Sequence, residues 1–160
     1  MDVAFILGLL QESLFLIAVF IFFLLFGMIR GKQAIINLIL SLYLALLLTL
    51  KFPYFSYLTK GTDPKSDAII MILIFAIFTV FVSILFARLM PREEYDTAFQ
   101  GFGKKTAYAL LATILVMIYS YHALPVTDLI TPGSPIQSLF GPAEHFFWWL
   151  LLPLVGLFVL

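Results

Sequence analysis

The sequence predicts an all-α membrane protein, a bundle of four transmembrane helices followed by a short C-terminal apolar helix. The composition is the first reason, because 63% of the residues are hydrophobic and 11% are charged, whereas soluble domains carry about 25% charged residues. The pattern is the second, because the apolar residues form long stretches that are separated by short breaks with charges. Each stretch approaches or exceeds the roughly 20 residues that a helix needs to cross about 30 Å of hydrocarbon.

The four predicted spans cover residues 13–29, 34–50, 68–89 and 106–123. They leave little of the 160 residues for anything else, so we expect a single integral membrane domain over residues 1–160. The first span is too long for the apolar core of a signal peptide and follows no positively charged segment. We therefore expect it to be a retained helix.

A fifth apolar segment, residues 146–160, follows a loop that is rich in proline and opens with Phe146, Phe147, Trp148 and Trp149. About 16 residues reach only about 24 Å at helical rise, which is short for a span. Two arrangements stay open: the segment spans the membrane as a short helix, or it lies in the outer interface on its tryptophans. Pro153 lies inside it in either case.

Lysine and arginine are distributed unevenly between the two sides of the predicted bundle. One side has Arg30, Lys32, Arg88, Arg92, Lys104 and Lys105, and the other has Lys51, Lys60 and Lys65. Basic residues in short loops favour the cytoplasmic side. This distribution predicts an outside N-terminus, with residues 30–33 and 91–105 in the cytoplasm.

The loops give more specific expectations. Tyr54, Phe55 and Tyr57 predict an aromatic anchor at headgroup level after the second span, and Ser66 or Asp67 is the expected N-cap of the third helix.

On the other side, Pro91 should end that helix. The run Gly101-Phe102-Gly103-Lys104-Lys105 lacks the phosphate-loop pattern, and it predicts a flexible turn with lysines that face headgroups.

Small and polar residues recur at steps of three and four within the spans. The polar members are Asn37, Ser41 and Thr49 in the second span, Thr79 and Ser83 in the third, and Thr113 in the fourth. Small residues mark helix contacts in lipid, where no hydrophobic force drives helices together. The alternative is a pathway for an ion or solute, although no ionisable residue lies in the middle of any predicted span. Asn37 needs a partner in either case, because a buried amide without a hydrogen bond is costly.

The sequence predicts no catalytic, cofactor or metal site. The chain has no cysteine, and it lacks the Gly-x-Ser-x-Gly elbow and paired aspartates in its spans. His122, Asp128, Glu144 and His145 share the outer side, but their spacing matches no ligand motif. Glu12 falls at the outer boundary of the first span. An enzyme acting on lipids would need converging ionisable groups near one interface, and only the region of His122 and Glu144 offers any.

Short motifs resemble a known family. Phe26-Gly27-Met28-Ile29-Arg30-Gly31-Lys32 ends one helix and begins the next almost without a loop. Residues 41–45, Phe52-Pro53-Tyr54, Ala87-Arg88-Leu89 and Gly101-Phe102-Gly103 follow in order. Over about residues 19–123 this order is similar to the colicin V production protein family, whose members are four-helix proteins of the bacterial inner membrane.

The resemblance implies an accessory or structural role in an envelope or export assembly, without catalytic activity and without active-site residues. The expected partners are the lipid bilayer and other membrane subunits or further copies of the chain. The balanced charge, nine basic and nine acidic residues, argues against nucleic acid. A small transporter or channel subunit, with a route lined by Asn, Ser and Thr, is the alternative function.

Overall fold

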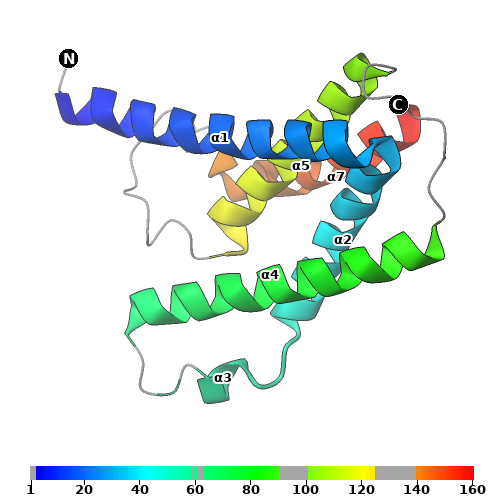
Figure 1. Cartoon of the computed structure of the whole chain (residues 1–160). Helices are drawn as coiled ribbons and strands as arrows, with labels where there is room; N and C mark the ends of the chain where they lie inside the picture. Colours follow the sequence, from blue (N-terminus) through cyan, green and yellow to red (C-terminus); the bar gives the residue numbers. More distant parts are fainter. Residues whose placement is uncertain (1–2, 59, 61–62, 91–100, 125–139) are drawn as a thin grey trace.

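The computed structural model describes residues 3–58, 60, 63–90, 101–124 and 140–160 (Figure 1). Its helices are α1 (Val3–Arg30), α2 (Lys32–Leu50), α3 (Phe55–Leu58), α4 (Pro64–Leu89), α5 (Phe102–His122) and α7 (Ala143–Val159). No strand occurs in these parts of the chain. Helices α1, α2, α4 and α5 are long and apolar enough to cross a membrane. The predicted all-α class and its four long apolar helices are confirmed.

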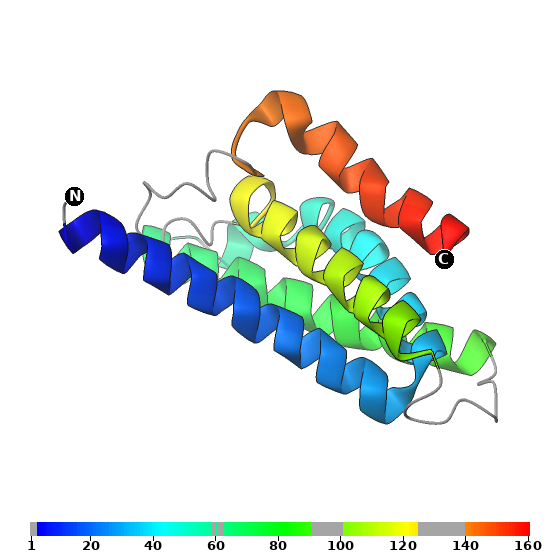
Figure 2. The same ribbon diagram turned by 90° about the horizontal axis from the view of Figure 1, so that it is seen from above.

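The long helices alternate in direction along the chain. As a result, the end of α1, the start of α2, the end of α4 and the start of α5 lie at one end of the bundle (Figure 2). Helix α7 lies beside α5, runs antiparallel to it and ends near the same end of the bundle (Figure 2). This arrangement favours the spanning alternative for the C-terminal segment.

Helix α5 lies at the centre of the packing. More than half of its residues are buried, and it contacts α1, α2 and α7. The fully or almost fully buried core includes Ile35, Ile39, Ala45, Tyr108, Ala109, Ala112, Leu115, Ile118 and Tyr119. Gly156 brings α7 close to α5, since a Cβ at this position would meet the Leu111 side chain at 2.6 Å.

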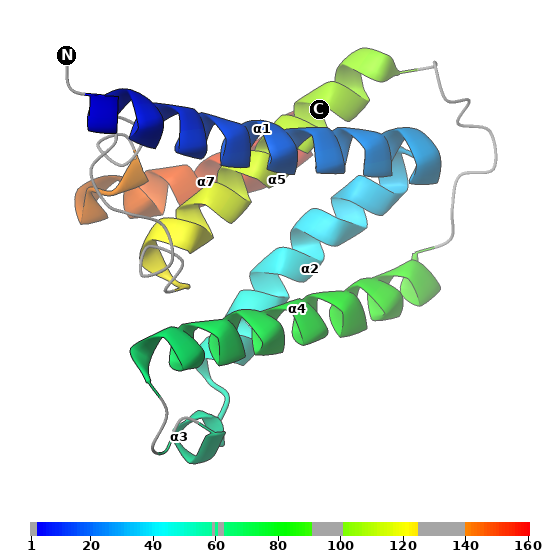
Figure 3. The same ribbon diagram turned by 60° about the vertical axis from the view of Figure 1, so that its left-hand side comes forward.

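Helix α4 is packed differently from the others. Ala68, Phe75 and Val82 are its buried hydrophobic residues, and Met71 and Phe78 between them pack against the core. This spacing of seven, with a residue three positions further on, is the a and d heptad spacing of a coiled coil. Its main contact is with α2, the most extensive helix contact in the described chain, and α4 stands apart from α1 (Figure 3).

The predicted first span, residues 13–29, agrees with the apolar part of α1, Ser13–Arg30. The helix itself begins ten residues earlier, at Val3, because the polar residues that interrupt the apolar run there are not helix breakers. Two other predicted boundaries are wrong. The N-cap of α4 is Asp63 and not the predicted Ser66 or Asp67. Pro64 follows in the first turn, where proline has no hydrogen bond to lose.

Helix α5 already begins at Phe102, so the predicted turn is the first turn of the helix. The expected stop at the end of α4 is confirmed, because the helix ends at Leu89 and Met90 is extended, as the residue before a proline prefers.

Candidate functional site

A groove of about 540 Å³ lies between the C-terminal half of α1, the N-terminal half of α2 and one side of α4. We call it the α1–α4 groove. Phe22, Phe23 and Phe26 of α1 form one wall, and the rings of Phe22 and Phe26 stack with centroids 6.5 Å apart. Its walls are mostly apolar, so in a bilayer it is suited to a hydrocarbon ligand.

The groove exists because of where the small residues of α4 lie. Ala76, Thr79, Ser83 and Ala87 lie beside the heptad seam of α4 and line the groove. These short side chains leave the space toward α1 open. At the other wall, α1 and α2 are in close contact, since a Cβ at Gly27 would lie 2.0 Å from the Ile35 side chain. The first two helices are therefore tightly joined while α4 stands away from α1.

The charged and amide groups of the groove gather toward one end. Arg30, Gln33 and Asn37 follow one another from the end of α1 into α2. Gln33 Nε2 donates a hydrogen bond to Asn37 Oδ1 at 3.3 Å and approaches Met90 Sδ at 3.6 Å. These amide orientations are assigned from the hydrogen-bond network. The groove is thus amphipathic along its length: it is most polar near Arg30, and beyond it the hydroxyls of Ser83 and Thr79 lie among apolar side chains.

Asn37 is the amide of the groove that has donors left over. Its side chain is only 4% exposed, and within the described chain its one side-chain hydrogen bond is the one that Oδ1 accepts. The Nδ2 group can therefore donate to an acceptor oxygen that is bound in the groove.

The structure separates the six polar residues that the sequence singled out. Asn37, Thr79 and Ser83 line the α1–α4 groove. Ser41 and Thr49 are buried in α2, and their hydroxyls donate to the carbonyls one turn earlier at 2.6 and 2.8 Å. Thr113 lines a second, apolar cavity of about 350 Å³ between α1 and α5, and it donates to its own helix at 2.8 Å. The six residues therefore do not form one continuous polar route.

The small-residue stripes of the second and third spans face the same space. Ala34 and Asn37 of α2 and Ala76 and Ser83 of α4 all line the groove. On α2, Ser41 and Thr49 of the stripe are buried among neighbouring helices. On α4 the stripe borders an open groove and does not form the tight helix contact.

Lys105 departs from its predicted environment. The sequence predicted a lysine that faces headgroups, yet Lys105 is 1% exposed, while its neighbour Lys104 is exposed. Helix α5 begins early enough to place Lys105 on the same side as Tyr108, Ala109 and Ala112, at helical steps of three, four and seven. That spacing is visible in the sequence and would have predicted the inward orientation.

Lys32 lies next to this part of α5. Its Nζ atom is 5.9 Å from the centroid of the Tyr108 ring, within the range of a cation–π interaction. This contact joins the start of α2 to the start of α5. It lies at the same end of the bundle as Arg30 and Gln33 of the α1–α4 groove.

Among the described residues of the predicted outer side, His122, Glu144 and His145 do not form a cluster of potential metal ligands. His122 Nε2 lies 2.6 Å from the carbonyl oxygen of Phe140, and its ring centroid is 4.7 Å from that of Phe146. Glu144 and His145 are exposed, and Asp128 lies outside the described residues. No group of three potential metal ligands occurs in the described part of the chain. Here His122 holds the segment that leads into α7.

Glu12 lies within α1.

A comparison of the chain with protein-family models, with curated proteins and with solved structures gives no match. The inference about function therefore depends on the membrane helices, the exposed surface of α4 and the amphipathic groove.

Proposed function

We propose that this protein is a non-enzymatic multi-pass subunit of a bacterial inner membrane, of the colicin V production type, and that it acts through contacts with other membrane proteins in an envelope or export assembly. The short motifs of the resemblance support the family. The packing of α4 supports the mode of action, and it is the observation on which the proposal depends.

In the apolar window of α4 only 6% of the residues are buried, against 11% in α1, 50% in α2 and 56% in α5. The contacts of α4 lie along one seam, and the rest of its surface is apolar and uncovered, with Ile77 65% and Phe81 55% exposed. Helices associate in lipid by close packing of such surfaces. A helix whose contacts in the described chain lie along one seam has room for a second helix from a partner.

A transporter is the second candidate, because Asn37 and Ser83 line a groove. Three features make it the weaker one. The groove is mostly apolar, its charged and amide groups gather at one end, and the hydroxyls of Ser41 and Thr49 are already bonded within α2. A route for a polar solute needs polar groups along its whole length.

Photo-crosslinking tests the proposed contact. A photoreactive amino acid at Ile77 should give a discrete protein adduct in the native membrane. Leu14 of α1, which is 62% exposed, is the matched control and should give mainly lipid adducts. Equal yields of protein adduct at both positions would contradict the assignment to α4. Specific, saturable solute flux through the purified protein in liposomes would favour the transporter instead.

A further inference from the structure

We propose that the α1–α4 groove is a binding site for an anionic phospholipid. One acyl chain lies along the small-residue stripe of α4, and the phosphate is bound by Arg30 at the polar end. This inference does not depend on the partner proposed above, because it concerns the groove and not the outward surface of α4.

The size of the groove fits an acyl chain. Its lining on α4 extends from Ile72 to Ala87, which is about 22 Å at helical rise. A volume of 540 Å³ lies within the roughly 300–1,000 Å³ of small-molecule sites. The groove is therefore long enough for a hydrocarbon chain.

Charge determines the class of headgroup. Arg30 is exposed at the groove end, and in the described parts of the chain no carboxylate forms an ion pair with it. A guanidinium binds phosphate oxygens through two parallel hydrogen bonds. Basic residues between membrane helices on the cytoplasmic side are typical sites for anionic headgroups, and Arg30 lies on the side that the basic residues predict to be cytoplasmic.

The Nδ2 donors of Asn37 fit the same ligand. Asn37 lies five residues into α2, about 7–8 Å deeper in the bilayer than the start of that helix. The ester oxygens of a phospholipid lie just below its phosphate, at a comparable depth. They only accept hydrogen bonds, as the free Nδ2 donors of Asn37 require. Phosphate at Arg30, esters near Asn37 and a chain along Ser83 and Ala76 thus match the order of polar and apolar groups in the groove.

Lipid retention by the purified full-length protein tests the proposal. Phosphatidylglycerol and phosphatidylcholine with identical acyl chains are added separately in mild detergent, and bound lipid is measured by native mass spectrometry. We expect phosphatidylglycerol to be retained at one copy per chain. Arg30→Gln should reduce its preference over phosphatidylcholine about fivefold, the fold-change that corresponds to the ~1 kcal/mol of one basic residue.

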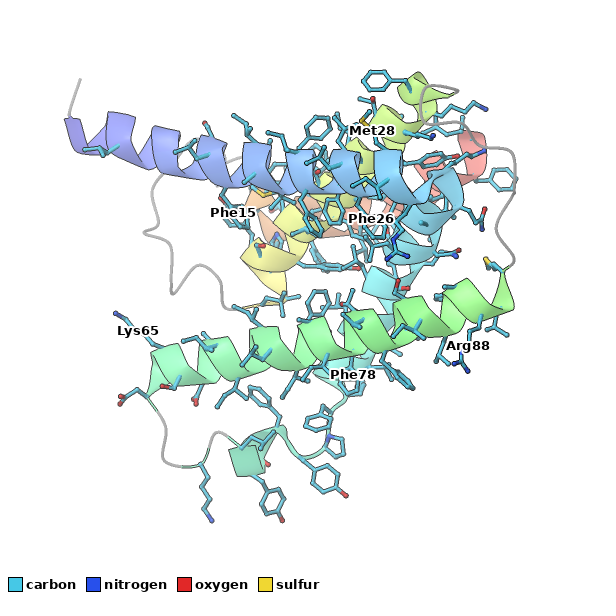
Figure 4. All side chains as sticks on the ribbon, viewed as in Figure 1. Phe15, Phe26, Met28, Lys65, Phe78 and Arg88 are labelled. Atoms are coloured by element: carbon cyan, nitrogen blue, oxygen red, sulfur yellow. The ribbon has the colours of Figure 1, made fainter. Side chains whose placement is uncertain are left out.

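Arg88→Gln is the matched control for charge. Arg88 lies at the same end of the bundle, does not line the groove, and points away from α1 (Figure 4). We expect Arg88→Gln to leave the preference unchanged. Equal losses in Arg30→Gln and Arg88→Gln would show a general surface charge effect and would overturn the site.

Two further variants test the acyl chain and guard against misfolding. Ser83→Leu should fill the groove and reduce retention of both lipids, whereas Arg30→Lys keeps the charge and should retain part of the preference. Three results would overturn the proposal. They are unchanged lipid retention in Ser83→Leu, equal retention of both lipids by the unmodified protein, and a second polypeptide bound in place of lipid.

Discussion

Gly31 joins α1 to α2 as a single residue, with φ 86° and ψ 170°. Residues other than glycine are strained at this combination, because Cβ clashes with the backbone. The chain can therefore reverse its direction between Arg30 and Lys32 without a loop. This gives a physical reason for an Arg-Gly turn, and it fixes the Arg30 side chain at the end of the groove.

We predict that Gly31→Ala lowers the free energy of unfolding by about 1–3 kcal/mol, the usual cost of such backbone strain. Gly103→Ala is the matched control, since Gly103 is helical, has no positive φ, and a Cβ there would meet nothing within 4 Å. It should be neutral or stabilising by up to about 1 kcal/mol. Thermal unfolding in detergent measures both variants, and equal stability of the two would show that Gly31 is not strained by substitution.

Substitutions at two serines distinguish a closely packed position from a position that faces the open groove. Ser41 has no exposed surface, whereas Ser83 is partly exposed and lines the groove. We predict that Ser41→Leu destabilises by about 1–3 kcal/mol through overpacking, and that Ser83→Leu costs clearly less because its side chain enters empty space. Chemical unfolding of the two variants in the same detergent compares them. A larger loss in Ser83→Leu would mean that the groove is closed in the folded protein.

At the scale of elements, the sequence predicts the four long helices because each is a continuous apolar run. Where α1 and α5 begin could not be predicted from hydropathy, since Glu12 and Lys104 are polar residues that helices accept. Which residues of α4 form its buried seam could not be predicted either, because this helix is apolar on all sides, with a mean hydropathy of 3.1. Its small-residue stripe was visible, but the groove that it borders depends on the distance between α1 and α4. That distance is set by tertiary packing, which no local pattern contains.

The seam of α4 can be tested at Phe75. This side chain is 8% exposed, and its ring packs edge-on against Tyr119 of α5 with centroids 5.9 Å apart. We predict that Phe75→Ala destabilises by about 1–3 kcal/mol. This loss is smaller than the ~3–5 kcal/mol that the same substitution costs in water-soluble cores. In a membrane the buried ring would otherwise contact lipid and not water, so its burial gains less free energy.

Phe81→Ala, at an exposed position of the same helix, is the matched control for the seam and should change the stability by less than Phe75→Ala. Unfolding of both variants in detergent gives the comparison. If the two losses were the same, α4 would not be held along the seam that contains Phe75.

At the scale of the whole molecule, the basic residues lie at two opposite ends. Arg30, Lys32, Arg88, Lys104 and Lys105 lie at one end, and Lys51, Lys60 and Lys65 lie at the other, as the alternation of the helices requires. Lys65 and Arg88 mark the two ends of α4 (Figure 4). Arg92 belongs to the segment outside the described residues. The polar end of the α1–α4 groove lies at the more basic end of the bundle, so the orientation in the membrane decides which leaflet would supply its lipid.

We predict that the N-terminus is outside, because the more basic end favours the cytoplasm. Reporter fusions after Lys32 and after Gln100 should behave as cytoplasmic, and a fusion after Gly61 should behave as external. The opposite result at two of these sites would reverse the orientation and would place Arg30 in the outer leaflet. A fusion after Leu160 decides the remaining alternative for α7. If α7 spans the membrane beside α5, this reporter is cytoplasmic; if α7 lies in the outer interface, it is external.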